Sequence, residues 1–415
     1  MSDDGVRFTG GASPPVHRQR FTVSFEYPVY FTSDSLSPGN PHLADAIAWR
    51  EPARRHRVLP VVDSGVANAW PQLSGDLRRY VGAHDDRLAL VAEPIVVPGG
   101  EPVKNDPAVV SHLLSRFDAL GMDRHSFVLV IGGGAVLDMA GYAAAVAHRG
   151  LRVVRMPTTV LSQNDSGVGV KNGVNAFGKK NFLGTFAPPH AVVNDSRFLA
   201  TLDRRDMLAG MAESVKVALI RDAAFFEWIS DQAEALSTGA PSAVELLVRR
   251  TAELHLAHIA GGGDPFETGS ARPLDFGHWA AHKLESMTAH RLRHGEAVAI
   301  GIALDTLYSA RAGLCDASLA ERVLGALSRI GLPTFDPALA ARADSGRLVV
   351  MDGLAEFREH LGGELTITLL AGPGRGVEAH AIDETRMAAC IMELMELWDL
   401  RERHLGPGGP ERPGS

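Results

Sequence analysis

The stretch "SFVLVIGGGAVLDMAGYAAAVAHRG", which runs from Ser126 to Gly150, restricts the possible folds more than any other part of the chain. An apolar run with strand-like composition leads into three glycines, and a helical pattern follows. Similar alternations flank it, in "RVLPVVDSGV", "RLALVAEPIVVPGGE" and "LRVVRMPTTVL". Strand, glycine turn, helix and strand in this order predict the α/β class, a parallel sheet with helices on its faces.

The pattern changes character at about Asp195, where helical segments such as "RDMLAGMAESVKVALI" and "GEAVAIGIALDTLYSARAG" take over. We therefore predict a Rossmann-like α/β domain over residues 21–197 and a mostly α-helical domain over residues 198–403. Residues 1–20 and 404–415 are rich in Gly, Pro and charge, so we expect them to be disordered tails.

Composition excludes several classes of function for this chain of 415 residues. Its net charge of −8 argues against a general nucleic-acid surface, so we expect a small anionic ligand and no nucleic-acid partner. The two cysteines lie far apart, which supports neither a disulfide framework nor a cysteine metal site. Because no run of eighteen apolar residues exists, we expect a cytoplasmic protein without a membrane partner.

Lysines are clustered in "QNDSGVGVKNGVNAFGKKNFLGTF". Only six of the 41 basic residues are lysine, and Lys171, Lys179 and Lys180 fall within ten positions. A compact ammonium suits phosphate as a point charge, and it can also move a proton, which a guanidinium cannot. The alternative is a solvated basic loop.

The three glycines place backbone N–H groups and a helix N-terminus where a pyrophosphate could dock. They do not form the standard G-x-G-x-x-G pattern, and a simple tight turn is the alternative. Asp138 on the following helix is either a partner of the helix dipole or an acceptor for a nicotinamide ribose. Glu101 and Lys104, after another strand, are either a surface pair or a bracket for ribose and phosphate.

A metal site is predicted from four residues with ligand chemistry. His278 and His282 have i, i+4 spacing on one helical face, and His294 begins the next helix. Glu213 lies in "GMAESVKVALI", with Lys216 one turn later. Two histidines and a carboxylate leave an open coordination position, which is the arrangement of catalytic zinc sites.

Together these segments resemble the sugar phosphate cyclases, the family of 3-dehydroquinate synthase. The resemblance spans roughly residues 58–395 and rests on "GGGAVLDMAG", "MPTTVLSQNDSGVGVKNGVN", "GKKNFLGTF", "GMAESVKVALI", "DPFETGSARPLDFGHWAAHKLE" and "HGEAVAIG". It implies NAD contacts at Asp63, Glu101, Lys104, Gly133, Gly134, Asp138, Thr158, Thr159, Lys180 and Thr201. It implies a divalent metal, zinc or cobalt, on Glu213, His278 and His294. It implies substrate and phosphate contacts at Arg149, Asp165, Lys171, Asn181 and Lys216, and a proton-handling role for His282.

The resemblance also implies a reaction without net oxidation. Bound NAD⁺ takes hydride from a ring carbinol, phosphate leaves by β-elimination, the hydride returns, and an intramolecular aldol addition closes a carbocycle. The enzyme would be a carbon–oxygen lyase acting on a sugar phosphate, and we expect a homodimer. The lysine cluster would then serve the leaving phosphate.

The chain departs from the dehydroquinate synthase pattern where that enzyme binds a substrate carboxylate. Ala271 and Asp275 stand at positions of Arg and Asn, Ala257 aligns with a lysine, and His360 aligns with a late lysine. Fewer cations and an added carboxylate disfavour an anionic substrate end. Asp275 and His360 resemble the cyclases that use sedoheptulose 7-phosphate, although Arg272 offers an alternative carboxylate partner.

Within that subgroup we expect 2-epi-valiolone as the product. The chain keeps a histidine at position 282 and carries "HGEAV", whereas the gadusol and 2-epi-5-epi-valiolone branches usually carry "GHTFSP" and "HGHAV". Three alternatives stay open: a 3-dehydroquinate synthase, a metal-dependent polyol dehydrogenase and a non-catalytic sugar-phosphate sensor.

Overall fold

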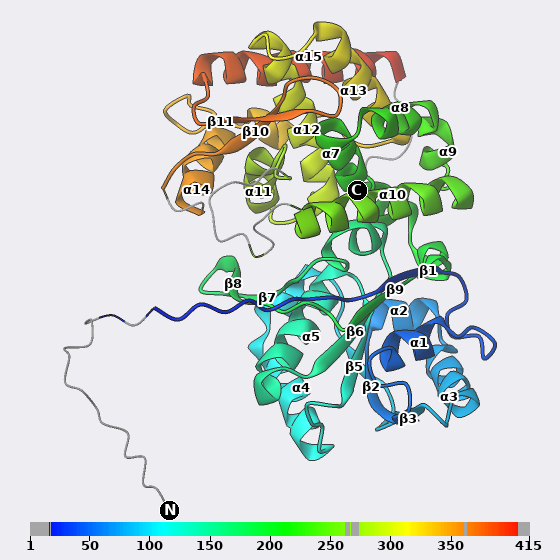
Figure 1. The fold of residues 1–415 in the computed structure, drawn as a ribbon. Helices are drawn as coiled ribbons and strands as arrows, with labels where there is room; N and C mark the ends of the chain where they lie inside the picture. The colour runs from blue at the N-terminus through cyan, green and yellow to red at the C-terminus, as the bar shows by residue number, and fades with distance from the viewer. Residues whose placement is uncertain (1–15, 17, 262–265, 267–273, 361–362, 406–415) are drawn as a thin grey trace, which may run out of the picture.

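A seven-stranded parallel sheet forms the first half of the structure, a computed structural model (Figure 1). The model describes residues 16, 18–261, 266, 274–360 and 363–405. The strand order is β1-β9-β6-β5-β2-β3, and β4 also pairs with β2. The strands are β1 (Val29–Thr32), β2 (His56–Asp63), β3 (Leu88–Leu90), β4 (Ile95–Val97), β5 (Phe127–Gly132), β6 (Arg152–Pro157) and β9 (Ala191–Asp195).

Helices cover both faces of this sheet, because the central strands are apolar on both sides. In β5, Phe127, Leu129 and Ile131 pack towards α1 and α3. The alternating residues Val128 and Val130 pack towards α4 and α5. The helical segments of this half are α1 (His42–Ala48), α2 (Ser64–Ala69), α3 (Leu73–Ala83), η1 (Glu101–Asn105), α4 (Pro107–Ala119), α5 (Gly134–Val146), η2 (Ala147–Arg149) and η3 (Ser162–Ser166).

The second half is a helical bundle with its own apolar core, centred on α7, α11 and α12. One short antiparallel pair, β10 (Ile367–Leu370) and β11 (Gly376–Ala379), accompanies the helices. The helical segments are η4 (Ser196–Thr201), α6 (Arg204–Gly210), α7 (Ala212–Arg221), α8 (Ala223–Asp231), α9 (Ala233–Ser237), α10 (Pro241–Gly261), α11 (His278–Met287), α12 (His294–Arg311), α13 (Ala317–Ile330), η5 (Pro337–Ala340), η6 (Val349–Met351), α14 (Asp352–His360) and α15 (Glu384–Leu405).

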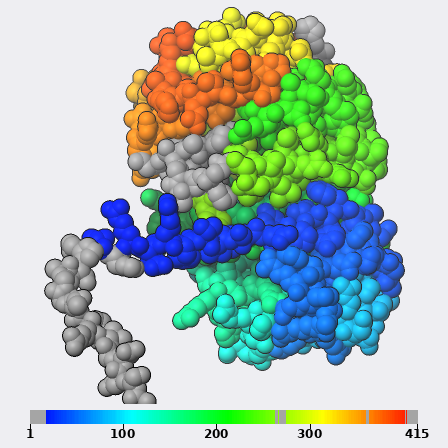
Figure 2. All heavy atoms as spheres, in the orientation of Figure 1, coloured from blue at the N-terminus to red at the C-terminus, as the bar shows by residue number. Residues whose placement is uncertain are grey.

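Two segments lie along the junction between the halves. The hairpin of β7 (Lys171–Ala176) and β8 (Lys179–Phe186) projects beside α5, and it carries the clustered lysines (Figure 1). The extended chain before β1 crosses the same junction on the face shown in Figure 2. There the Tyr27 hydroxyl donates to the carbonyl of Val168 at 2.8 Å.

The predicted fold class is confirmed: a parallel α/β half is followed by a mostly helical half. The last sheet strand ends at Asp195 and α6 begins at Arg204, around the predicted boundary. Most of the two predicted tails lies outside the described residues. No helix in the described ranges is long and apolar enough to cross a membrane.

A buried arginine, Arg155 on β6, organises the segment that joins η3 to the hairpin. Its guanidinium donates to the carbonyl oxygens of Gly167 (3.1 Å), Gly169 (2.8 Å) and Lys171 (3.0 Å). It also donates to Asn172 Oδ1 at 2.7 Å. Because one planar cation satisfies four oxygens, the strand fixes the path of the segment that carries Lys171.

We expect Arg155→Met to lower the free energy of unfolding by roughly 3 kcal/mol or more, since each buried acceptor left without a donor costs about 1–3 kcal/mol. Urea denaturation measures the change. Arg124→Met, at an exposed position after α4, is the control and should stay within about 0.5 kcal/mol of the unmodified protein. Equal stability of the two variants would contradict this role for Arg155.

Candidate active site

Three side chains from three helices converge in the helical half as a candidate metal centre. Glu213 comes from the first turn of α7, whereas His278 and His294 are the first residues of α11 and α12. Their potential ligand atoms lie within 4.8 Å of one another. Nε2 of His278 lies 3.4 Å from Oε1 of Glu213, and Nε2 of His294 lies 3.5 Å from the same oxygen.

The other ring nitrogens of the two histidines already have partners. Nδ1 of His278 lies 3.2 Å from the carbonyl oxygen of Phe276. Nδ1 of His294 lies 3.3 Å from Oε2 of Glu285. Such partners fix the orientation of metal-binding imidazoles and leave Nε2 for the ion. Oε1 of the buried Glu213 lies beside both Nε2 atoms, so the three groups fit a divalent cation.

The separation of the two histidines is set by contact between main chains. Gly277 precedes α11 with a φ of 78°, a conformation that favours glycine. A Cβ on Gly301 of α12 would lie 2.0 Å from the carbonyl oxygen of Gly277. Both glycines are therefore needed for α11 to begin against α12.

A buried carboxyl group, Asp305 on α12, holds the turn before α11. It accepts hydrogen bonds from the N–H of Gly277 at 3.0 Å and from Nε1 of Trp279 at 2.9 Å. Burial raises the pKa of Asp305 to about 7, although these two hydrogen bonds act in the opposite direction. The sequence did not indicate this residue, because a single Asp in an apolar helix leaves no local pattern.

Lys216 forms an ion pair with Glu213 one turn away on α7, and both are buried. Burial alone would lower the pKa of Lys216, but the carboxylates of Glu213, Asp165 and Asp275 raise it. Nε2 of His255 on α10 lies 2.9 Å from Oδ1 of Asp165 in η3. The site thus surrounds one ammonium with three carboxylates.

The predicted nucleotide contacts gather at the carboxyl ends of parallel strands. Asp63 ends β2 and pairs in register with Val97 at the end of β4. Nζ of Lys104 donates to Asp138 Oδ2 at 2.7 Å. Nδ2 of Asn175 on the hairpin lies 3.4 Å from Oε1 of the predicted contact Glu101.

Glycines let the start of α5 approach the segment after β6 closely. A Cβ on Gly133 would lie 3.3 Å from Cγ2 of Thr159, and one on Gly134 would lie 2.7 Å from Oγ of Ser166. Thr158 is buried directly after β6. Such a cradle at the N-terminus of α5 fits the pyrophosphate of a dinucleotide.

Other predicted residues lie near the metal ligands, on the helical side and on the hairpin. The exposed ring of His282 lies 5.5 Å from that of His278, measured between centroids. Half-buried Asp275 precedes α11. Nζ of Lys180, predicted as an NAD contact, donates to Oε1 of Glu285 at 2.9 Å, which connects it to His294.

The four remaining predicted residues are Arg149, Lys171, Asn181 and Thr201. Arg149 is exposed with a φ of 64° beyond α5, a helix that runs about 20 Å away from its start at the strand ends. Within one chain it therefore does not reach the site. Thr201 donates its hydroxyl to Phe198 within η4. Lys171 and Asn181 are exposed on the hairpin.

Part of the predicted carboxylate-binding region is not described. Ala271 and Arg272 lie outside the described residues, as does the side chain of His360. Ala257, matched to a family lysine, is exposed on α10, whereas His255 two residues earlier is buried against Asp165. A sequence signal for His255 was available, because Thr251 and His255 are polar residues at i, i+4 spacing in an apolar helix face.

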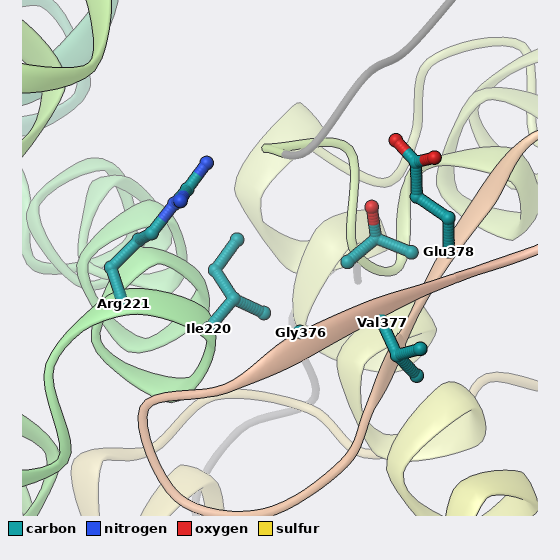
Figure 3. Close-up of a pocket in the computed structure, with 6 residues that line it drawn as sticks. Ile220, Arg221, Gly376, Val377 and Glu378 are labelled. Atoms are coloured by element: carbon teal, nitrogen blue, oxygen red, sulfur yellow. The ribbon is translucent and has the colours of Figure 1, made fainter. Parts of the chain in front are cut away.

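A further pocket lies at the opposite end of α7 from Glu213. Figure 3 shows it between the end of α7 and β11. Its lining residues are Ile220, Arg221, Thr368, Gly376, Val377 and Glu378. None of these was predicted as a site residue, so this pocket is separate from the candidate active site.

Comparison with known proteins decides the family. Residues 94–209 match the family model described as 3-dehydroquinate synthase N-terminal, and residues 210–346 match 3-dehydroquinate synthase C-terminal. A 2-epi-5-epi-valiolone synthase of Streptomyces glaucescens is 39% identical over 316 residues, 75% of this chain and 77% of the relative. The chain belongs to the sugar phosphate cyclase family. The predicted resemblance is thus confirmed.

Two other members of the sugar phosphate cyclase family are similar over most of their length. A 3-dehydroquinate synthase of Rhodopseudomonas palustris (strain BisB18) is 36% identical over 347 residues, covering 82% of this chain and 87% of that protein. The 2-epi-5-epi-valiolone synthase ValA of Streptomyces hygroscopicus subsp. jinggangensis 5008 was solved with NAD⁺ and Zn²⁺ bound. Its structure superposes with a TM-score of 0.81 at 30% identity, covering 92% of this chain and 100% of that chain.

The metal centre predicts a loss of zinc when one ligand is removed. His278→Ala should abolish stoichiometric zinc binding, because two remaining ligands hold the ion far more weakly. Metal analysis after dialysis measures the zinc content. His112→Ala, exposed on α4, is the control and should bind as much zinc as the unmodified protein. Full zinc content in His278→Ala would disprove the assignment.

The buried carboxyl group predicts a pH dependence of stability. Because the folded-state pKa of Asp305 lies above its ordinary value of 3.8, the unfolded chain loses this proton first. This group therefore contributes stability at low pH that is lost as the pH rises from 3.8 to about 7. We expect the unfolding free energy of Asp305→Asn, relative to the unmodified protein, to increase over this range in urea denaturation. Asp86→Asn, at an exposed turn, should show no such trend.

Proposed function

We propose that the chain cyclises sedoheptulose 7-phosphate with loss of phosphate, using NAD⁺ and a divalent metal, zinc or cobalt. The expected product is a C7 cyclitol, 2-epi-valiolone. Membership of the sugar phosphate cyclase family supports the reaction class. The known relatives include both valiolone and dehydroquinate synthases, so the substrate is argued from the site itself.

The excess of carboxylates around Lys216 carries the substrate proposal. Glu213, Asp165 and Asp275 all act on this ammonium. A substrate carboxylate entering here would meet like charges in a desolvated cleft, which disfavours it by several kcal/mol. Hydroxyl groups would instead donate hydrogen bonds to the carboxylates. The neutral hydroxymethyl ketone end of sedoheptulose 7-phosphate fits this chemistry.

Both cofactors have residues suited to hold them. Glu213, His278 and His294 would bind the metal, and the strand ends with Asp63, Glu101, Lys104 and Asp138 would bind NAD⁺. When bound, the metal and NAD⁺ supply polarisation of a substrate oxygen and reversible oxidation of the ring alcohol.

The chain's own residues would orient the sugar phosphate and manage its protons. Lys171 and Asn181 on the hairpin would contact the phosphate and neutralise it as it leaves. Asp165 and Asp275 would accept hydrogen bonds from substrate hydroxyls. Desolvation and the neighbouring imidazoles of His278 and His294 lower the pKa of His282 to about 3, so its neutral ring would accept a proton from the substrate. A homodimer is the proposed assembly.

Two other functions compete with this proposal. A 3-dehydroquinate synthase is the first, since one such enzyme, from Ruegeria pomeroyi, is 38% identical to the chain over 291 residues. A metal-dependent polyol dehydrogenase is the second. A probable glycerol dehydrogenase from Sinorhizobium meliloti 1021 shares the fold, with a TM-score of 0.56 at 17% identity.

We expect phosphate release from sedoheptulose 7-phosphate to be on the order of thirtyfold or more faster than from the carboxylate-bearing substrate of 3-dehydroquinate synthase. Each substrate is incubated with zinc-loaded protein and NAD⁺, and free phosphate, NADH absorbance and product mass are followed. NADH absorbance should stay flat over many turnovers. Asp275→Asn combined with Ala271→Arg should lower the ratio of the two phosphate-release rates. Asp316→Asn, at an exposed position before α13, should leave it unchanged.

Each alternative has its own outcome in this experiment. Rapid conversion of the carboxylate-bearing substrate would identify a 3-dehydroquinate synthase and disprove the substrate assignment. Stoichiometric NADH accumulation with a simple alcohol would identify a dehydrogenase. Tight binding of sugar phosphate without phosphate release would identify a sensor.

A further inference from the structure

An imidazole–carboxylate pair crosses the junction between the two halves. Nε2 of His255, on α10 of the helical half, lies 2.9 Å from Oδ1 of Asp165 in η3 of the sheet half. The His255 side chain is only 6% exposed, whereas that of Asp165 is 32% exposed. The histidine is thus the more buried member of the pair.

A second polar connection fixes the same two segments one helical turn away. Asn164, which precedes Asp165, donates through Nδ2 to Oγ of Ser214 at 3.1 Å. The hydroxyl of Thr251 on α10 donates to the same Oγ at 2.8 Å. Asp165 is therefore bonded directly to α10, and Asn164 is connected to α10 through Ser214 of α7, which restricts the position of the Asp165 side chain.

The Asp165 carboxylate faces the reaction centre and keeps its charge there. Burial by itself would raise the pKa of Asp165, but His255 and Lys216 lower it below its ordinary value. Glu213 acts on it in the opposite direction. Oδ1 is paired with His255, and a carboxylate has a second oxygen that can accept a further hydrogen bond.

We propose that His255 is a positioning residue for the cyclisation: it holds the Asp165 carboxylate beside Lys216 so that the second oxygen accepts a hydrogen bond from a hydroxyl of the sugar phosphate. This inference rests on the proposed function. It also means that His255 is the residue of α10 that acts on the site, whereas Ala257 is exposed.

The test uses two substitutions that differ in one N–H group. His255→Leu fills a similar volume but cannot donate, whereas His255→Gln keeps an N–H at the reach of Nε2. Steady-state kinetics with sedoheptulose 7-phosphate should show kcat/KM at least about tenfold lower for His255→Leu, as for loss of a hydrogen bond to a charged group. His255→Gln should recover to within about threefold of the unmodified protein, because it keeps that hydrogen bond.

A double-mutant cycle separates positioning from general damage to the helix. If His255 acts through Asp165, then Asp165→Asn and the double variant Asp165→Asn/His255→Leu should have equal kcat/KM. His258→Leu is the same change three residues later on α10, where the side chain lies against Arg221, and should keep normal kinetics. Zinc content, NAD⁺ affinity and thermal midpoint are measured for every variant.

Two results would overturn the role of His255 while leaving the proposed function intact: unchanged kcat/KM in His255→Leu, or losses from His255→Leu and Asp165→Asn that multiply in the double variant. Absence of turnover by the unmodified protein with any sugar phosphate would overturn the proposed function and this inference with it. The two failures are therefore distinguishable in one set of assays.

Discussion

The burial of Glu213 is the constraint on which the arrangement of the helical half depends. A carboxylate removed from water is tolerated only when positive charge or donors surround it. Lys216 on the same helix supplies one charge, and the first residues of α11 and α12 bring two imidazoles to the same oxygen. The helices must therefore begin near one point, and the positive ends of α11 and α12 face the anion. The core packing of the bundle follows from this convergence.

The sheet half provides the opposite wall of the site through a different constraint. Parallel strands end at one edge, so residues distant in sequence, such as Asp63, Lys104 and Thr159, gather there without direct contacts among them. Connections across the junction then complete the site. Arg155 directs the chain into the hairpin, and α10 holds η3 directly through His255 and indirectly through Thr251 and Ser214. The reaction needs both halves, because the metal ligands lie in the helical half and the predicted nucleotide contacts lie in the sheet half.

The features that sequence predicts well are those with local patterns. Alternating strands and helices indicated the α/β half, and the spacing of His278 and His294 with Glu213 indicated a cluster that the structure brings together. Features that depend on long-range geometry were missed. The His255–Asp165 pair joins residues ninety positions apart, and the sequence indicated only that Ala257, two residues later, stands where the family has a lysine.

The contact between Gly277 and Gly301 has a consequence for how such a protein can change over time. The contact between the turn before α11 and helix α12 is made by backbone atoms, so it does not depend on the side chains near the metal ligands. Residues that line the cleft, including Asp275 and His282, are free to vary in size and charge without moving α11 against α12. A descendant could thus change its sugar phosphate specificity through a few substitutions near the metal ligands and keep the same arrangement of those ligands.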